Sequence, residues 1–320
     1  MSQYLLSAPL PTPALIESDQ LAKKLVLDID TATQEVHLQT MDFDTKKSMR
    51  TIVSSLIAAS ARGVSVSLAF DYRAYSMRPV SVYTAVKKLR NSGVTVVHLG
   101  NSWVGYPIAG RSHGKMHVID NVVYIGGGMN LRGDSFEHRD YMLRYESAEL
   151  ASIVRGIQLS THGSKPTADK TYVLDADNSL IVDGGMRGAS RILDAAVEMT
   201  KNAKQSWYLS QLSPDPLLAD NLQRTGATCM FNTAKSQKGW AGKVISRIDN
   251  RITRLNNTYK SSQKIHAKVI ISEDPGGRLS VISGSHNFAR SGVQLGTREI
   301  ALHSTDQALA STFIEFIRAT

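Results

Sequence analysis

Two short segments of this 320-residue chain repeat each other, and the repeat limits the folds that the chain can adopt. The segments are "SHGKMHVID" at 112–120 and "KIHAKVIIS" at 264–272. Each places a lysine two residues after a histidine, and then continues with residues typical of a strand. The two histidines, His113 and His266, are 153 residues apart (266 − 113). A single long repeat of this kind predicts two similar halves and excludes a solenoid of short units.

The similarity continues downstream of each motif. A second strand ends in "GGGMN" with Asn130 in the first copy and in "SGSHN" with Asn287 in the second. The separation of histidine and asparagine is 17 residues in the first copy (130 − 113) and 21 in the second (287 − 266), and the turn "EDPGGR" in the second copy accounts for the four extra residues. Acidic residues follow at Asp140 and Glu299. Four features in the same order indicate a duplicated unit.

Hydrophobic periodicity predicts an α/β protein. Strands are expected at 36–43, 64–71 and 94–99, with helices at 46–63 and 82–93 between them, and a hairpin is expected from "KMHVID" and "VVYIGG". The polar segment 160–180 is the best candidate for a linker. We therefore predict two mixed-sheet halves, 1–165 and 166–320, related by a pseudo-twofold axis with the active site at their seam. In the second half we expect helices at 189–203, 215–226, 242–260 and 306–320, and strands at 206–212, 227–233, 264–272 and 279–284.

The motif residues suit chemistry on a phosphodiester. Side chains two apart on a strand share a face, so His113 and Lys115 should project together, as should His266 and Lys268. The lysines and asparagines could bind nonbridging phosphate oxygens, while one histidine attacks phosphorus and the other transfers a proton. A carboxylate on the far ring nitrogen would fix each tautomer, and Asp140 and Glu299 are the candidates. Which histidine is the nucleophile stays open.

These motifs resemble the phospholipase D superfamily. "AASARGVSVSLAFD" at 58–71 adds to the resemblance, and "HGKMHVIDNVVYIGGGMN" with "HRD" at 138–140 looks most like its cardiolipin synthase and phosphatidyltransferase branch. The resemblance implies a duplicated phospholipase D-like fold and metal-independent phosphodiester exchange through a phosphohistidine, without a cofactor. It implies catalytic roles for His113, His266, Lys115, Lys268, Asp120, Asp140 and Glu299. It implies phosphate binding by Asn130 and Asn287, and we expect the adjacent small residues Gly128 and Ser285 to contribute to the substrate site. No metal ligand set is expected.

Three positions need separate treatment. The second copy has Glu273 where the first has Asp120. This departure from the motif calls the full activity of the second half into question. His117 shares a strand face with Lys115, and we expect it at the rim or in packing. His286, inside "SGSHN", is interpreted equally well as a substrate contact or a turn residue.

The charge of the chain indicates anionic partners. The net charge is +9, and residues 235–268 contain nine Lys or Arg residues against Asp249 alone, an excess of +8. A stripe of these could contact an anionic membrane surface or a nucleic acid, and no obligate protein partner is evident.

The single cysteine, Cys229, excludes an intrachain disulfide. We expect a cytoplasmic protein that can associate peripherally with the membrane, because no long apolar run or secretory signal is evident.

Three functions compete on this evidence. The preferred one is a phospholipid-acting hydrolase or phosphatidyl transferase. The second is a nuclease of the same superfamily that cleaves DNA or RNA, supported by the basic stretch. The third is an inactive anion-binding relative, supported only by Glu273.

Overall fold

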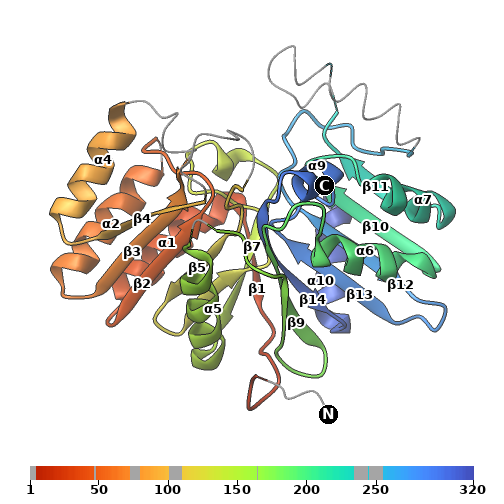
Figure 1. Cartoon of the computed structure of the whole chain (residues 1–320), viewed down its shortest axis with the longest axis horizontal. Helices are drawn as coiled ribbons and strands as arrows, with labels where there is room; N and C mark the ends of the chain where they lie inside the picture. Colours follow the sequence, from red (N-terminus) through yellow and green to blue (C-terminus); the bar gives the residue numbers. More distant parts are fainter. Residues whose placement is uncertain are drawn as a thin grey trace.

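The structure is a computed structural model that describes residues 5–46, 48–72, 80–100, 110–163, 165–233, 244 and 255–320. Two seven-stranded sheets stand side by side, each flanked by helices (Figure 1). The strands of the first sheet are β1 (Ala14–Glu17), β2 (Glu35–Thr40), β3 (Ser65–Asp71), β4 (Thr95–Leu99), β5 (Met116–Ile119), β6 (Val122–Ile125) and β7 (Tyr141–Glu146). Those of the second are β8 (Lys170–Val173), β9 (Asn178–Gly184), β10 (Gln205–Ser210), β11 (Thr228–Phe231), β12 (Val269–Glu273), β13 (Leu279–Gly284) and β14 (Arg298–Ser304).

The helices follow the same division. The first half contains α1 (Ser18–Thr31), α2 (Met49–Ala61), α4 (Val80–Asn91), the short 3₁₀ helix η1 (Ser135–Glu137) and α5 (Ala148–Thr161). The second half contains α6 (Arg191–Lys201), α7 (Pro216–Arg224), α9 (Arg290–Gln294) and α10 (Gln307–Arg318).

The two sheets have matching topology. The order β7-β6-β5-β2-β3 in the first sheet corresponds to β14-β13-β12-β10-β11 in the second. In each, the last pair is parallel and the remaining pairs are antiparallel, so both sheets are mixed. The expected duplicated α/β fold is therefore confirmed.

Apolar residues form three clusters that explain this arrangement. One cluster packs α1, α2 and α4 on the outer face of the first sheet, and another packs α6 and α7 on the outer face of the second. The third is shared: it joins the inner faces of both sheets with α5 and α10. Tyr141 of β7 exemplifies the joint, because its ring lies 5.2 Å and 4.9 Å from the rings of Phe313 and Phe316 in α10.

Most expected elements are present with small shifts at their ends. One difference matters for the site, because each His-x-Lys motif precedes its strand: β5 begins at Met116 and β12 at Val269. The motifs were expected to form the first residues of these strands, but their backbones pair across the seam instead. The proposed linker 160–180 includes β8, and the expected helix 242–260 lies mostly outside the described residues. The boundary at 165/166 stays a prediction.

His117 has a packing role and lies nowhere near a rim. Its side chain is fully buried on β5, and its ring lies 6.2 Å from that of Tyr124. Within the described residues neither ring nitrogen has a hydrogen-bond partner. Burial therefore lowers the pKa of His117 to about 4, because charging it here would leave the imidazolium unsolvated.

This burial predicts sensitivity to acid. A pKa below that of the unfolded chain gives stability that is present above about pH 6.5 and is lost as the pH falls toward 4. Replacing His117 by leucine removes this loss. Between pH 7 and pH 4, the free energy of unfolding of His117→Leu should rise relative to the wild type by about 3 kcal/mol. Urea unfolding at both pH values measures it. The half-buried His303 gives the control His303→Leu, for which a smaller relative gain is expected. Parallel pH dependence of His117→Leu and wild type would contradict the argument.

Candidate active site

Backbone pairing between the two halves positions both histidines. Ser112 pairs with Arg298, and the His113 amide donates to the Arg298 carbonyl at 2.8 Å. In the equivalent place Arg139 pairs with Ile265, and the His266 amide donates to the Arg139 carbonyl at 3.0 Å. Each motif is thus fixed to the strand of the other half that carries an acid.

His113 is paired with the acid of the second half. Its Nδ1 lies 2.9 Å from both carboxylate oxygens of Glu299, whose Oε2 also accepts from the Ser285 hydroxyl at 2.5 Å. Burial alone would raise the pKa of Glu299, but the contact with His113 holds it at about 2. Burial lowers the pKa of His113 to about 4, against the opposing effect of Glu299.

His266 is paired with the acid of the first half. Its Nδ1 lies 2.7 Å from Asp140 Oδ2, and the Asp140 carboxylate also accepts from the Tyr141 and Gly128 amides. Burial raises the pKa of Asp140 to about 6. Burial, reinforced by the charges of Lys268 and Lys115, lowers the pKa of His266 well below its ordinary value. In both pairs Nε2 is the nitrogen left for chemistry.

The two lysines are arranged alike. Lys115 Nζ donates to the His113 carbonyl at 2.6 Å, and Lys268 Nζ donates to the His266 carbonyl. Both side chains are buried, at 1% and 0% exposure. Burial lowers the pKa of Lys268 to about 8, and burial together with the charge of Lys268 lowers the pKa of Lys115 well below its ordinary value.

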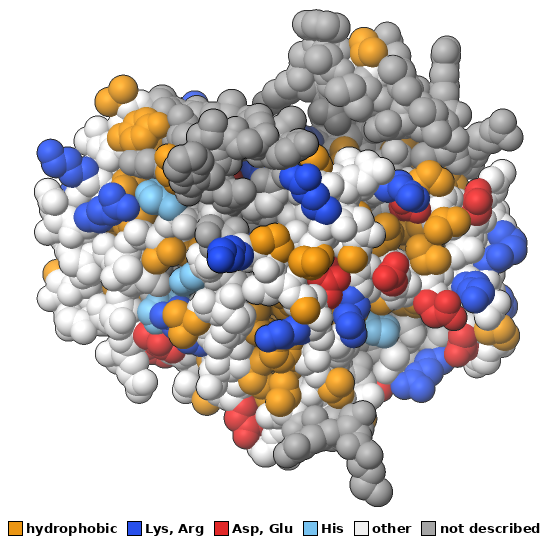
Figure 2. All heavy atoms as spheres, viewed as in Figure 1, with side chains coloured by type: hydrophobic (Ala, Val, Ile, Leu, Met, Phe, Trp, Pro, Cys, Tyr) orange, Lys and Arg blue, Asp and Glu red, His pale blue; other side chains and the backbone are white. Residues whose placement is uncertain are grey.

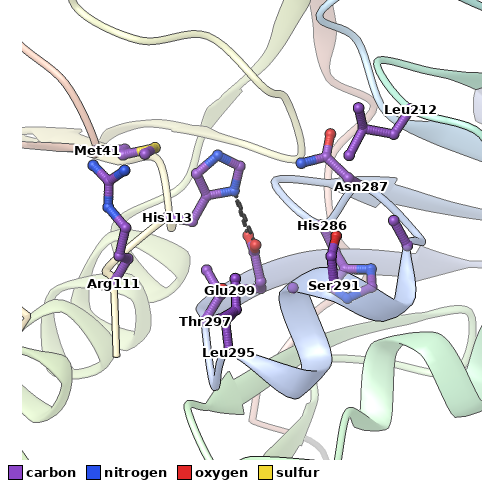
Figure 3. A pocket seen from close by; sticks show the side chains of 12 residues that line it. Met41, Arg111, His113, Leu212, His286, Asn287, Ser291, Leu295, Thr297 and Glu299 are labelled. Carbon is purple, nitrogen blue, oxygen red and sulfur yellow. Dashed lines mark hydrogen bonds and ion pairs between the residues drawn. The ribbon is translucent and has the colours of Figure 1, made fainter. Parts of the chain in front are cut away.

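The two asparagines have different surroundings. Asn130 is buried, and its Oδ1 accepts from Thr40 at 3.3 Å. Asn287 lines a cavity of about 200 Å³ that also includes His113 and Glu299. Figure 3 shows its amide group across this cavity from His113. Its Oδ1 is buried and has no hydrogen-bond partner in the described chain.

Ser285 and Gly128 were predicted to contribute to the substrate site, but the structure gives them other contacts. Ser285 is fully buried and its hydroxyl donates to Glu299, so it orients an acid and does not reach substrate. The Gly128 amide donates to Asp140 at 3.3 Å, and a Cβ there would lie 2.5 Å from the His266 carbonyl oxygen and 2.8 Å from Lys268 Nζ. Gly128 therefore serves close packing beneath the site.

Asp120 does not reach the reacting groups, which corrects the prediction of a catalytic role. It lies in the β5–β6 turn with φ of 48°, seven residues and roughly 20 Å of extended chain from His113. Its carboxylate accepts from the Thr33, Gln34 and Glu35 amides at 2.8–2.9 Å.

Glu273 occupies the equivalent end of β12, remote from His266, where it pairs with Lys204 at 3.1 Å. The change from Asp to Glu therefore leaves the second site intact.

Sequence reasoning missed His138, whose ring lies 5.8 Å from that of His266. It also missed Arg139 and Arg298, which precede the two acids. Arg139 donates to the Phe316 carbonyl of α10 at 2.9 Å, and Arg298 to the Thr161 carbonyl of α5 at 3.0 Å. Each arginine thus binds the C-terminal end of a helix of the other half, where a cation is favourable. Their spacing of 159 residues (298 − 139), equal to that of the acids, was the available signal.

A second polar chain lies behind Glu299. Asp183 accepts from the Ser190 hydroxyl at 2.5 Å, and Ser190 Oγ lies 3.5 Å from His286 Nε2. His286 Nδ1 accepts from the Phe288 amide at 2.9 Å, which fixes the ring. His286 is therefore a turn residue whose side chain also lines the cavity, and its contact with substrate stays a prediction. Burial raises the pKa of Asp183 to about 7.

The described residues contain no group of three or more His, Cys, Asp or Glu side chains arranged to hold a metal ion. In the same part of the chain no helix combines the length and the apolar character needed to cross a membrane.

Comparison with known proteins places this geometry in a family. Residues 25–157 match the family described as "Cardiolipin synthase, PLD-like domain". Phosphatidylserine synthase from Haemophilus influenzae Rd KW20 has a similar structure, with a TM-score of 0.73 over 96% of this chain and 85% of that chain at 10% identity. Residues 25–157 therefore carry a domain of the phospholipase D type.

A second structural neighbour of this phospholipase D-like chain is polyphosphate kinase from Porphyromonas gingivalis. The TM-score is 0.61 over 96% of this chain and 50% of that chain, at 15% identity, so the chain spans about half of that enzyme. At such identities both structures indicate the fold alone. No curated protein sequence matches the chain.

The exchanged acids predict a specific pattern of losses. Asp140→Asn and Glu299→Gln keep the volume but favour the wrong histidine tautomer, so kcat for a simple phosphodiester such as bis(p-nitrophenyl) phosphate should fall by about 10²- to 10⁴-fold. Asp120→Asn is the matched control. It should lower the melting temperature and leave kcat within about threefold. An equal loss of kcat in Asp120→Asn would show that Asp120 does take part in catalysis.

Gly128 predicts a steric effect on catalysis. Gly128→Ala pushes the added methyl group against the His266 carbonyl and Lys268 Nζ, so activity should fall by about 100-fold, the usual result of displacing catalytic groups by about 1 Å. Gly156→Ala on α5, where a Cβ meets nothing within 4 Å, should retain full activity and melt at a slightly higher temperature. Full activity of a folded Gly128→Ala variant would contradict the packing role.

Proposed function

We propose that this protein transfers or hydrolyses the phosphatidyl group of a phospholipid through a covalent phosphohistidine. The observation that carries the proposal is the meeting of two Nδ1-anchored imidazoles and two buried lysines at one seam. One neutral Nε2 attacks phosphorus, and the other imidazole protonates the departing oxygen. The lysines neutralise charge on the nonbridging oxygens, and the amide groups of the two asparagines donate hydrogen bonds to them.

Two observations favour a lipid over a nucleic acid. The cavity beside His113 is small and has apolar walls from Met41, Leu212 and Leu295. On the face drawn in Figure 2, the Lys and Arg side chains of the coloured part are scattered among acidic and apolar ones and form no continuous track for a polynucleotide backbone. The family match and the phosphatidylserine synthase fold agree with a lipid substrate.

Partners and location follow from the same proposal. A phospholipid substrate requires at least transient contact with a membrane surface, and Lys and Arg residues of 235–268 would attract anionic headgroups. Of these, Lys235, Lys238, Lys243, Arg247, Arg251 and Arg254 lie outside the described residues.

The test uses purified full-length protein in EDTA with phosphatidylglycerol vesicles, with and without a competing alcohol. Headgroup release, or a new phosphatidyl alcohol in its presence, is expected from the wild type. His113→Asn and His266→Asn should lower it by at least about 10³-fold, and Asp120→Asn should retain it. Parallel reactions with single- and double-stranded DNA test the nuclease alternative. Nicking without lipid turnover would overturn the lipid proposal, and inactivity in both assays would favour the anion-binding alternative.

A further inference from the structure

Each half of the protein has a buried polar residue where the second strand of its parallel pair ends. In the first half it is Asp71, the last residue of β3, and in the second it is Asn232, directly after β11. The β2–β3 register ends at Phe70 and the β10–β11 register at Phe231, so each polar residue directly follows the equivalent phenylalanine. Their exposed fractions are 1% and 3%. Although β3 and β11 lie on opposite sides of the molecule (Figure 1), the two residues occupy the same place in the duplicated unit.

Asp71 binds the backbone directly before His113. Its Oδ2 accepts from the Ser112 amide at 2.8 Å, and its Oδ1 is paired with the Arg111 guanidinium at 3.2 Å. Ser112 is itself buried. A buried amide that loses its acceptor is costly, so this contact fixes the position of residue 112 relative to the end of β3.

Asn232 makes the equivalent contact in the second half. Its Oδ1 accepts from the Ile265 amide at 2.9 Å, and its Nδ2 donates to the Ile265 carbonyl at 2.8 Å and to the Gln211 carbonyl at 2.9 Å. Ile265 directly precedes His266, and it lies 153 residues after Ser112 (265 − 112), which is the spacing of the two histidines. The same backbone position is therefore held in both halves, by an aspartate in one and by an asparagine in the other.

The opposite half holds the same two segments from their other side. Main-chain hydrogen bonds to Arg298 hold the segment before His113, and main-chain hydrogen bonds to Arg139 hold the segment before His266. The backbone before each histidine thus lies between a strand of the opposite half and a side chain of its own half. Contacts on both sides leave the histidine that follows little freedom to move.

The neighbouring strands contact the two asparagines of the motifs in a related way. Thr40 Oγ1, at the end of β2, donates to Asn130 Oδ1 at 3.3 Å. Ser210 Oγ, at the end of β10, donates to the Asn287 carbonyl at 3.2 Å. The C-terminal ends of both parallel pairs therefore support the motifs, at the edge of the sheet where α/β proteins commonly place their sites.

We propose that Asp71 and Asn232 are positioning residues, which hold the backbone directly before His113 and His266 so that each imidazole reaches the acid of the opposite half. The role rests on the proposed function, because the two residues act only through these histidines. Displacing a reacting group by about 1 Å lowers the rate by about 100-fold, and the hydrogen bonds between histidine and acid tolerate smaller shifts than that. The rate should therefore depend on both side chains.

The partners of each side chain predict which replacements it accepts. Both oxygens of Asp71 accept, and an asparagine there can still accept from the Ser112 amide through its Oδ1. A longer side chain has little room, because a Cβ on Gly100 would already lie 2.8 Å from Asp71 Oδ2. Asn232 accepts and donates, so an aspartate there would place a carboxylate oxygen against the Ile265 carbonyl. We therefore expect Asp71→Asn to be tolerated, and Asp71→Glu and Asn232→Asp to displace the backbone.

Steady-state kinetics of the full-length protein with bis(p-nitrophenyl) phosphate tests the role. Asp71→Ala and Asn232→Ala should lower kcat by about 100-fold and leave KM within about threefold of the wild type. Asp71→Glu and Asn232→Asp should lower kcat by at least about tenfold, whereas Asp71→Asn should keep it within about threefold. The rate is expressed per folded molecule, from the circular dichroism of the same sample, so that partial unfolding does not count as a loss of kcat.

Asp175→Ala is the control for a buried carboxylate whose role is structural. Asp175 accepts from the Asp177 and Asn178 amides in the β8–β9 turn. Asn178 pairs with Ser304, which lies five residues and roughly 17 Å along β14 from Glu299. Asp175→Ala should therefore melt at a lower temperature and keep the wild-type kcat.

The outcomes separate this role from the proposed function. Wild-type kcat in folded Asp71→Ala and Asn232→Ala would overturn the positioning role. If an alanine variant does not fold, Asp71→Glu and Asn232→Asp decide in the same way. A loss of kcat in Asp71→Asn as large as that in Asp71→Ala would overturn the argument from hydrogen bonding. A wild type inert toward both bis(p-nitrophenyl) phosphate and phosphatidylglycerol would overturn the proposed function instead.

Discussion

Each histidine of this protein is oriented by an acid from the opposite half, and the rest of the site depends on that exchange. His113 is held by Glu299 and His266 by Asp140, at 2.9 Å and 2.7 Å. Neither half can therefore fix the tautomer of its own histidine. Hydrogen bonds of this length tolerate shifts of only a few tenths of an ångström, so the seam has to be rigid. Main-chain pairing at Arg298 and Arg139, one residue before each acid, supplies that rigidity.

The same two arginines connect the site to the larger packing. Each extends from the seam to the C-terminal carbonyls of a helix in the other half, α5 or α10. Those two helices belong to the apolar cluster that both sheets share. Burial of this shared core consequently stabilises the position of the catalytic groups as well as the fold. At its centre the duplicated protein is therefore a single unit, because each histidine–acid pair takes one residue from each half.

The duplicated fold and the residues that meet at the seam could be predicted from the sequence alone. Period-2 patterns and the 153-residue repeat are both visible in the order of the residues and need no knowledge of tertiary contacts. It did not predict which acid serves which histidine, since that depends on the register between the two halves. The prediction of a catalytic role for Asp120 was wrong for a related reason. Its motif position lies near His113 along the chain, but a strand carries it to the other end of the sheet, where three backbone amides bind it. Ser285 and Gly128 were placed correctly but assigned contacts that their burial forbids.

The electrostatics of the site explain why a buried cluster of basic groups can serve catalysis. His113, His266, Lys115 and Lys268 are all buried, and all have lowered pKa values. Among the described residues, Asp140 and Glu299 are the acids in contact with these histidines, so the group cannot hold its full positive charge. A phosphodiester brings the missing negative charge, so its binding should favour protonation of the lysines and of one histidine.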